Sequence, residues 1–149
     1  MQTIQMDHVE FKIPASFTWV DDEGTLVASL PNVDDVVLRI STQSIQKNGI
    51  PVPGAAIQVI TKTAQRESRA LQHYNSTVWY ETVTSASQGS PGSMVHFWNV
   101  GFDAHGLVIS CFVDGRALES RDARMVSDSV VPIIQSIRNR PNKAIEPTR

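Results

Sequence analysis

The sequence has few of the residues by which several protein classes are recognised. It contains one cysteine among 149 residues, Cys111, which excludes an intramolecular disulfide and a cysteine-rich zinc site. Charged residues make up 19% of the chain and nearly balance to a formal net charge of −2, which argues against a strongly basic nucleic-acid-binding protein. No segment approaches the roughly 18 consecutive apolar residues of a transmembrane helix. We therefore expect neither a nucleic-acid partner nor a membrane partner.

The amino terminus also lacks the basic and apolar segments of a secretory leader. Together with the lone thiol, this predicts a cytoplasmic protein, although the sequence does not reveal whether a leader was removed from a longer precursor. The length suits one domain, because a chain of about 150 residues buries roughly 68–70% of its unfolded surface. The 41% of hydrophobic residues can then form a core without a disulfide or a structural metal.

Six segments have the composition of β-strands: residues 9–13, 25–30, 36–40, 77–83, 94–102 and 107–113. The last two are apolar at both alternating sets of positions, which predicts strands that are buried on both faces of a sheet. The turn between them, from Asp103 to Gly106, is expected to leave His105 facing water.

Two segments, residues 55–72 and 120–138, have the 3.6-residue period of amphipathic helices. Their apolar faces carry Ile57, Ile60, Ala64 and Leu71 in the first segment, and Val126, Val130, Ile133 and Ile137 in the second. Pro132 lies on the outer face of the second segment and predicts a kink there. Residues 85–93, Ser-Ala-Ser-Gln-Gly-Ser-Pro-Gly-Ser, predict a mobile loop whose role the sequence leaves open.

The resulting order, β-β-β-α-β-β-β-α, predicts an α+β fold. We expect an antiparallel sheet of about six strands flanked by two main helices, in a single domain of residues 1–139. Residues 140–149 have no hydrophobic periodicity and contain two prolines, which predicts a disordered C-terminal tail.

This order of elements resembles the PsbP-like superfamily over residues 8–139. The similarity rests on the segment Phe-Lys-Ile-Pro-Ala-Ser-Phe-Thr-Trp at residues 11–19, the three strands before a helix, the long hairpin, and a final helix ending Ile-Ile-Gln-Ser-Ile-Arg. That superfamily includes an extrinsic subunit of photosystem II, a nuclear-import factor that binds the GTPase Ran, and many small bacterial proteins. The resemblance implies an α/β/α sandwich and non-enzymatic binding to a macromolecule, and it transfers no site residues.

The end of the chain resembles another known kind of sequence. The segment Asn-Lys-Ala-Ile-Glu-Pro-Thr, residues 142–148, is similar to the translated ends of proteins encoded in integron gene cassettes. This resemblance implies a small bacterial member, carried horizontally as an accessory gene.

No catalytic motif or cofactor-binding loop occurs in the sequence. The four histidines are too scattered to predict a metal site. Cys111 alternates with Ile109 and Val113 in an apolar strand, so we expect an inert core thiol. A Gly-x-Ser-x-Gly elbow and a glycine-rich phosphate-binding loop are also missing. We therefore expect no catalytic residue, no metal and no cofactor.

An aromatic ligand pocket is one alternative. Trp79, His96 and Trp98 lie on strands that we expect to be neighbours, so they could line a pocket between the sheet and a helix. Aromatic residues at such positions are also typical of an ordinary core.

A basic stripe on the first helix is the other candidate site. Lys62, Arg66, Arg69 and His73 fall within about 60° of one another at 100° per residue. Four of the 13 basic residues and one of the 15 acidic residues lie from Arg138 onward, so residues 1–137 carry nine basic and fourteen acidic residues, a net of −5. A basic stripe on an acidic body can orient an acidic partner, although a solvated helix face has the same pattern.

These patterns favour a non-catalytic binding or accessory protein that engages a macromolecular partner, with an immunity-like or antitoxin-like role as one form of it. The alternative is a small-ligand-binding protein or enzyme that uses the aromatic pocket. An exposed sheet edge could also pair across a two-fold axis, so the chain is expected to be a monomer or a homodimer. The sequence names neither the partner nor the ligand.

Overall fold

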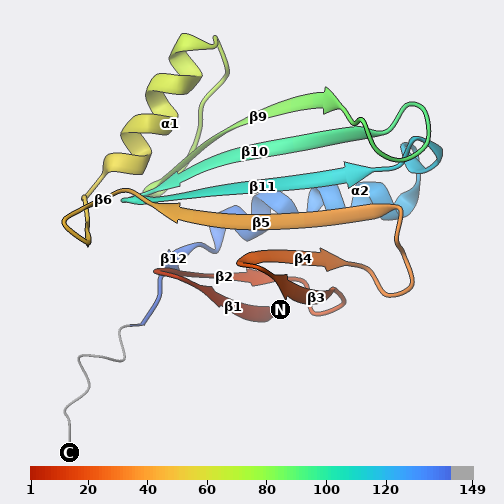
Figure 1. Cartoon of the computed structure of the whole chain (residues 1–149), viewed down its shortest axis with the longest axis horizontal. Helices are drawn as coiled ribbons and strands as arrows, with labels where there is room; N and C mark the ends of the chain where they lie inside the picture. The colour runs from red at the N-terminus through yellow and green to blue at the C-terminus, as the bar shows by residue number, and fades with distance from the viewer. Residues whose placement is uncertain (142–149) are drawn as a thin grey trace, which may run out of the picture.

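A seven-stranded antiparallel sheet is the centre of the computed structural model, which describes residues 1–141 (Figure 1). Its strand order is β3-β4-β5-β11-β10-β9-β8, and each neighbouring pair is antiparallel. The strands are β3 (Thr18–Asp22), β4 (Thr25–Ser29), β5 (Val36–Ser44), β8 (Gln72–Tyr74), β9 (Thr77–Ser85), β10 (Met94–Phe102) and β11 (His105–Val113). The predicted α+β class with a large antiparallel sheet is confirmed, and β3 and β8 are strands that the sequence patterns did not indicate.

A smaller sheet joins the two ends of the described chain. It contains β1 (Gln2–Met6), β2 (Val9–Ile13) and β12 (Arg138–Asn139), with β2 in the middle. The Nε atom of Arg138 donates a hydrogen bond of 2.6 Å to the buried carboxylate of Glu10, which fixes β12 against β2. The backbone N–H of Arg140 donates to the carbonyl of His8 at 2.8 Å, so the ordered chain extends past the predicted boundary at residue 139. Most of the predicted tail, residues 142–149, lies outside the described residues.

One face of the large sheet carries the core. Side chains at alternate positions of the central strands are almost fully buried, because successive residues of a strand point to opposite faces. They pack against the small sheet and two helices, α2 (Arg121–Asp128) and α3 (Val130–Gln135). The largest of them are Leu38, Ile40, Trp98, Leu107 and Ile109.

The opposite face of the sheet is only partly covered. We predicted β10 and β11 to be buried on both faces, and this is wrong for the second face. Val108 is 42% exposed there, while Phe97 and Phe112 are half-buried. The apolar composition of these strands therefore reflects a core on one side and an open, partly apolar surface on the other.

The last predicted helix is divided in two. The side-chain hydroxyl of Ser129 donates to the carbonyl of Val126 at 2.5 Å, and the helix is interrupted at this residue between α2 and α3. Pro132 lies in the first turn of α3, where its missing N–H leaves the carbonyl of Asp128 without an intrahelical partner. The predicted kink is thus a break three residues before the proline. The helix also ends at Gln135 rather than at residue 138, where the chain enters β12.

The first helix, α1 (Ala55–Arg66), is shorter than the predicted segment of residues 55–72. Ser68 has a φ of 55°, the left-handed conformation that ends many helices. The N–H of Arg69 donates to the carbonyl of Ala64 at 2.8 Å, the long hydrogen bond of a Schellman motif. Because a serine rather than a glycine takes the left-handed position, the sequence carried no obvious stop signal.

Candidate functional site

The turn between β10 and β11 holds α1 over one end of the open sheet face. The backbone carbonyl of Asp103 accepts hydrogen bonds from the N–H groups of Ala56 at 3.0 Å and Ile57 at 3.3 Å. Its side-chain Oδ1 accepts one from the N–H of Gly54 at 2.7 Å. The first N–H groups of a helix have no intrahelical partner, so this turn takes the place of a capping side chain. The start of α1 is thereby fixed to the sheet.

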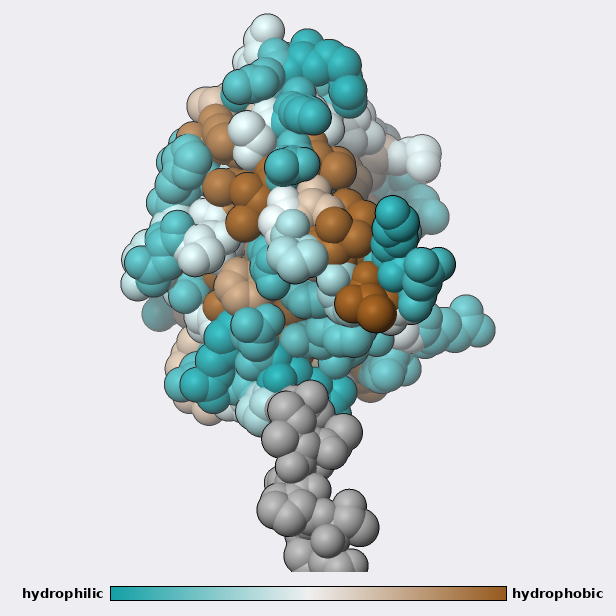
Figure 2. Space-filling view, turned by 90° about the vertical axis from the view of Figure 1, so that its left-hand side faces the viewer, coloured by the Kyte–Doolittle hydropathy of each residue, from teal (hydrophilic) through white to brown (hydrophobic). Residues whose placement is uncertain are grey.

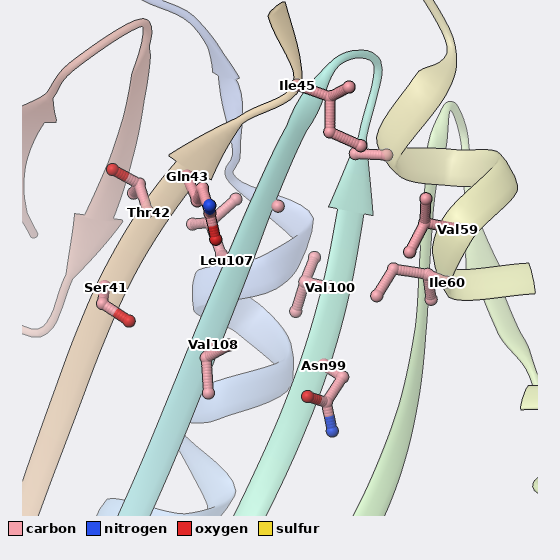
Figure 3. Close-up of a pocket in the computed structure, with 12 residues that line it drawn as sticks. Ser41, Thr42, Gln43, Ile45, Val59, Ile60, Asn99, Val100, Leu107 and Val108 are labelled. Carbon is pink, nitrogen blue, oxygen red and sulfur yellow. The ribbon is translucent and has the colours of Figure 1, made fainter. Parts of the chain in front are cut away.

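A cleft lies between α1 and the open sheet face. It has a volume of about 350 Å³. Figure 3 shows its side chains coming from β5, β10 and β11 on one side and from α1 on the other. Hydroxyl and amide groups of Ser41, Gln43 and Asn99 line it beside aliphatic side chains, and no charged side chain does so among the described residues. The cleft is therefore suited to uncharged, partly apolar groups.

Three exposed aliphatic side chains line this cleft: Ile45, Val59 and Val108, of which Val59 is 51% exposed. Ile50, five residues after Ile45 in the chain, is 68% exposed. Figure 2 shows hydrophobic side chains gathered in the middle of this end of the molecule, with hydrophilic side chains around them. An apolar centre with a polar border is typical of surfaces that bind other proteins.

The four predicted basic residues lie at and beyond the end of α1, and they do not share a helix face. Lys62 and Arg66 are on the helix, Arg69 is in the connection that follows, and His73 is on β8. All four are exposed. We call these four residues the basic cluster. The predicted stripe was wrong in its geometry, because the helix ends at Arg66.

Two residues of the basic cluster, Arg66 and Arg69, act electrostatically on Tyr80 of β9. Burial and the neighbouring Glu67 carboxylate raise the pKa of Tyr80, while the charges of Arg66 and Arg69 act in the opposite direction. Arg69 is three residues before Gln72, which pairs opposite Trp79, so the connection that carries Arg69 enters the sheet at the β9 edge. Glu67 is the nearest acidic group, at 3.8 Å from Arg66, and exposed pairs of this kind contribute little to stability.

The three residues of the predicted aromatic pocket lie on one face of the sheet, and within residues 1–141 the two tryptophans belong to the core. Trp79 and Trp98 are buried in the core, and the ring of His96 stacks on Trp98 with centroids 3.8 Å apart. The Nε2 atom of His96 lies 2.8 Å from Oε1 of Glu81. His96, without the tryptophans, lines a hollow of about 240 Å³ between the sheet and α2. Burial raises the pKa of Cys111, which also lines this hollow, to about 11.

Sequence reasoning missed a cluster around His105. We expected this residue to face water, but it is 5% exposed. Its Nδ1 atom lies 2.6 Å from Oγ of Ser44, and its ring stacks on His8 with centroids 5.2 Å apart. Burial, followed by the neighbouring His8, lowers the pKa of His105. Ser44 and His8 come from distant parts of the chain, so no local pattern announced the contact. No group of three or more potential ligands is placed to hold a metal ion within residues 1–141.

The loop predicted to be mobile, residues 85–93, is attached to Asp114. The carboxylate of Asp114 accepts hydrogen bonds from both the hydroxyl and the backbone N–H of Ser90, the latter at 3.2 Å. It also accepts one from the backbone N–H of Arg116 at 3.1 Å. These bonds hold the pKa of Asp114 well below its usual range. Ser93 adds a further link, because its hydroxyl accepts from the N–H of Gly115 at 2.9 Å. The loop is thus fixed at its second half.

Replacing Asp114 by asparagine is expected to release this loop. A carboxylate with a lowered pKa stabilises the folded state fully above the ordinary aspartate pKa of about 3.9, and this contribution is lost as the pH falls below that value. The protection factors of the Ser90 and Gly115 amides, which relate their exchange rates to the intrinsic rate at the same pH, should fall in Asp114→Asn at neutral pH and in the wild type under acid. The exposed Asp128→Asn is the control. Unchanged exchange at both amides in Asp114→Asn would contradict this assignment.

The fold agrees with known structures. No family model matches the sequence, and neither does any curated protein. A crystal structure from Bacteroides thetaiotaomicron VPI-5482 has a TM-score of 0.60 at 15% identity, covering 90% of this chain and 46% of that one, so this chain spans less than half of that protein. The solution structure of CyanoP, the cyanobacterial PsbP of Synechocystis sp. PCC 6803, has a TM-score of 0.55 at 10% identity, covering 93% and 92%.

The chain therefore has a PsbP-like α+β fold with one open sheet face. At these identities the similarity defines the fold alone. Among residues 1–141, no helix has the length and apolar character needed to cross a membrane.

Proposed function

We propose that this chain is a non-catalytic binding or accessory protein that engages a macromolecular partner through the surface built on α1. The observation that carries this proposal is the group of exposed aliphatic side chains Ile45, Val59 and Val108 around the cleft, because Val59 lies on the same helix as Lys62 and Arg66 of the basic cluster. Isolated exposed aliphatic residues are ordinary, whereas a group of them around a cleft is typical of an interaction surface.

The charges of this surface indicate an acidic partner. Residues 1–137 carry a net charge of −5, so the basic cluster is a local exception on an acidic body. Such an arrangement orients an acidic partner during encounter and repels it elsewhere on the surface. An immunity-like or antitoxin-like role in the cytoplasm is one form that this binding would take, since an acidic surface on a toxin would be neutralised by direct contact.

Reversing two charges of the cluster tests this proposal. We expect Arg66→Glu with Arg69→Glu to weaken capture of a partner from a lysate of the source organism at least about tenfold, because the attraction becomes repulsion. The matched control is Lys12→Glu with Arg121→Glu, which makes the same change of charge at exposed side chains on β2 and α2. Circular dichroism should show both variants folded.

Equal loss of capture in both double variants would mean that net charge alone governs binding. If the wild type captures no partner, a second candidate function gains support, that of a small-ligand-binding protein. The observation in its favour is His96, which lines the hollow beneath α2 and is paired with Glu81. A thermal-shift screen of metabolites then becomes the relevant measurement.

A further inference from the structure

The outer edge of β9 is open along most of its length. Strand β8 pairs with only the first three residues of β9, from Gln72 opposite Trp79 to Tyr74 opposite Thr77. The rest of β9, Tyr80–Ser85, is paired with β10 on one side, and no strand of residues 1–141 pairs with it on the other. In Figure 1, the arrowhead end of β9 forms the upper border of the sheet. Alternate residues there present unpaired backbone N–H and C=O groups.

This edge also lacks the features that normally prevent strand pairing. Tyr80–Ser85 contains no proline and no lysine, and its pairing with β10 continues without a bulge. Its one charged side chain, Glu81, is engaged by His96 at 2.8 Å. Val83 is 58% exposed and offers an apolar contact beside the free backbone groups. The other edge strand of the sheet, β3, differs because it carries two carboxylates, Asp21 and Asp22.

The basic cluster lies where the open part of the edge begins. Leu71 precedes the paired residues of β8, and the chain leaves the sheet there toward Arg69 and Arg66. Gln72, three residues after Arg69, pairs opposite Trp79, the neighbour of Tyr80, which is the first residue of the open part. A segment added beside β9 would therefore meet positive charge at the end nearest Tyr80.

We propose that the open edge of β9 binds an extended acidic segment of the partner as an additional antiparallel strand. This inference rests on the proposed function and specifies the partner's binding element. Each neighbouring pair of the sheet is antiparallel, and an added strand with that orientation has its carboxyl end beside Arg66 and Arg69. Acidic residues at the carboxyl end would then face the arginines. The residues from Glu81 to Ser85 accommodate about five residues of added strand, roughly 17 Å.

A designed peptide tests the inference without changing the protein. The probe is a fluorescently labelled peptide in which threonine and valine alternate and the last residues are aspartates. Fluorescence anisotropy should show binding to the full chain that weakens as salt increases. Hydrogen exchange should show new protection at alternate amides between Tyr80 and Ser85, because only alternate N–H groups face the edge.

Two N-methylated versions of the probe distinguish strand addition from simple charge attraction. An N-methyl group removes one hydrogen-bond donor and blocks close approach of the backbones. Methylation of the alternate amides that face β9 should weaken binding at least about tenfold, whereas methylation of the other set should change it less than about threefold. Equal binding of both versions and of the parent would overturn the inference.

Charge reversal separates this inference from the proposed function. If Arg66→Glu with Arg69→Glu weakens binding of the probe but N-methylation has no effect, the basic cluster binds acidic groups and strand addition is wrong. Failure of the wild type to bind the probe also overturns strand addition, while capture of a folded partner still tests the proposed function independently. Sedimentation could instead show a dimer in which the β9 amides are protected without any peptide. The edge would then be occupied by a second copy of this chain, which also contradicts the inference.

Discussion

Replacement of Trp98 by alanine is expected to lower the free energy of unfolding by about 3–5 kcal/mol, the usual range for removing a large aromatic side chain from a core. Trp98 is 2% exposed and lies at the centre of β10, between Glu81 on β9 and Ile109 on β11. Its indole also supports the ring of His96 at a centroid distance of 3.8 Å. The substitution therefore leaves a cavity and removes the surface against which His96 is held. Urea denaturation followed by far-UV circular dichroism measures the change.

Trp19 provides the matched control for this experiment. It lies on the edge strand β3 and is 42% exposed, so Trp19→Ala removes the same side chain without emptying the core. We expect this variant to change the free energy of unfolding by less than about 1 kcal/mol. Similar losses in the two variants would show that the core is not centred on β10. A midpoint shift without a change in denaturant slope would confirm that both variants remain two-state.

Substitution of Gly101 by alanine is expected to destabilise the protein by about 1–3 kcal/mol, because α1 approaches β10 closely at this residue. A Cβ atom on Gly101 would lie 2.8 Å from the backbone carbonyl oxygen of Ala56 and 3.1 Å from Cα of Ile57. These are backbone atoms, so relief requires the start of α1 to move away from the sheet. The same movement would widen the cleft and loosen the bonds from α1 to Asp103.

Gly106 makes a matched control because it is paired directly opposite Gly101 on β11. A Cβ atom there would meet its nearest neighbour, the carbonyl oxygen of Gln43, at 3.5 Å, an ordinary contact distance. Gly106→Ala is therefore expected to change stability by less than about 0.5 kcal/mol. Hydrogen exchange in α1 should accelerate in Gly101→Ala alone. Equal behaviour of the two variants would mean that α1 is not held by this close approach.

Strand positions were predicted well where hydrophobic periodicity was strong. The predicted segment 94–102 coincides with β10, and residues 107–113 fall within β11, because long apolar strands have few alternative structures. Helix ends were predicted poorly. The left-handed Ser68 ends α1 six residues before the predicted limit, and neither glycine nor proline marks this position. Strand β1 was missed because most of its residues are polar and it is stabilised by pairing with β2.

Of the candidate surface, the sequence singled out the four basic residues, but neither their arrangement nor the cleft beside α1. Lys62 and Arg66 lie on α1 as expected, whereas Arg69 and His73 reach the same region by way of the connection and β8. The predicted association of His96 with Trp98 exists as a stacked pair rather than as the wall of an aromatic pocket. Alternation along β10 could indicate that these two side chains share a face. It could not indicate that Trp98 would be almost fully buried.

By itself, the sequence determined the α+β class, the antiparallel central strands and the excess of basic residues around the end of the first helix. These features follow from local periodicity and composition, which act over a few residues. Only the tertiary structure decided which sheet face stays open, that His105 is buried against Ser44, and that the edge of β9 is unpaired. Each of these depends on contacts between segments far apart in the chain, such as Asp103 with the start of α1, and those contacts leave no local pattern.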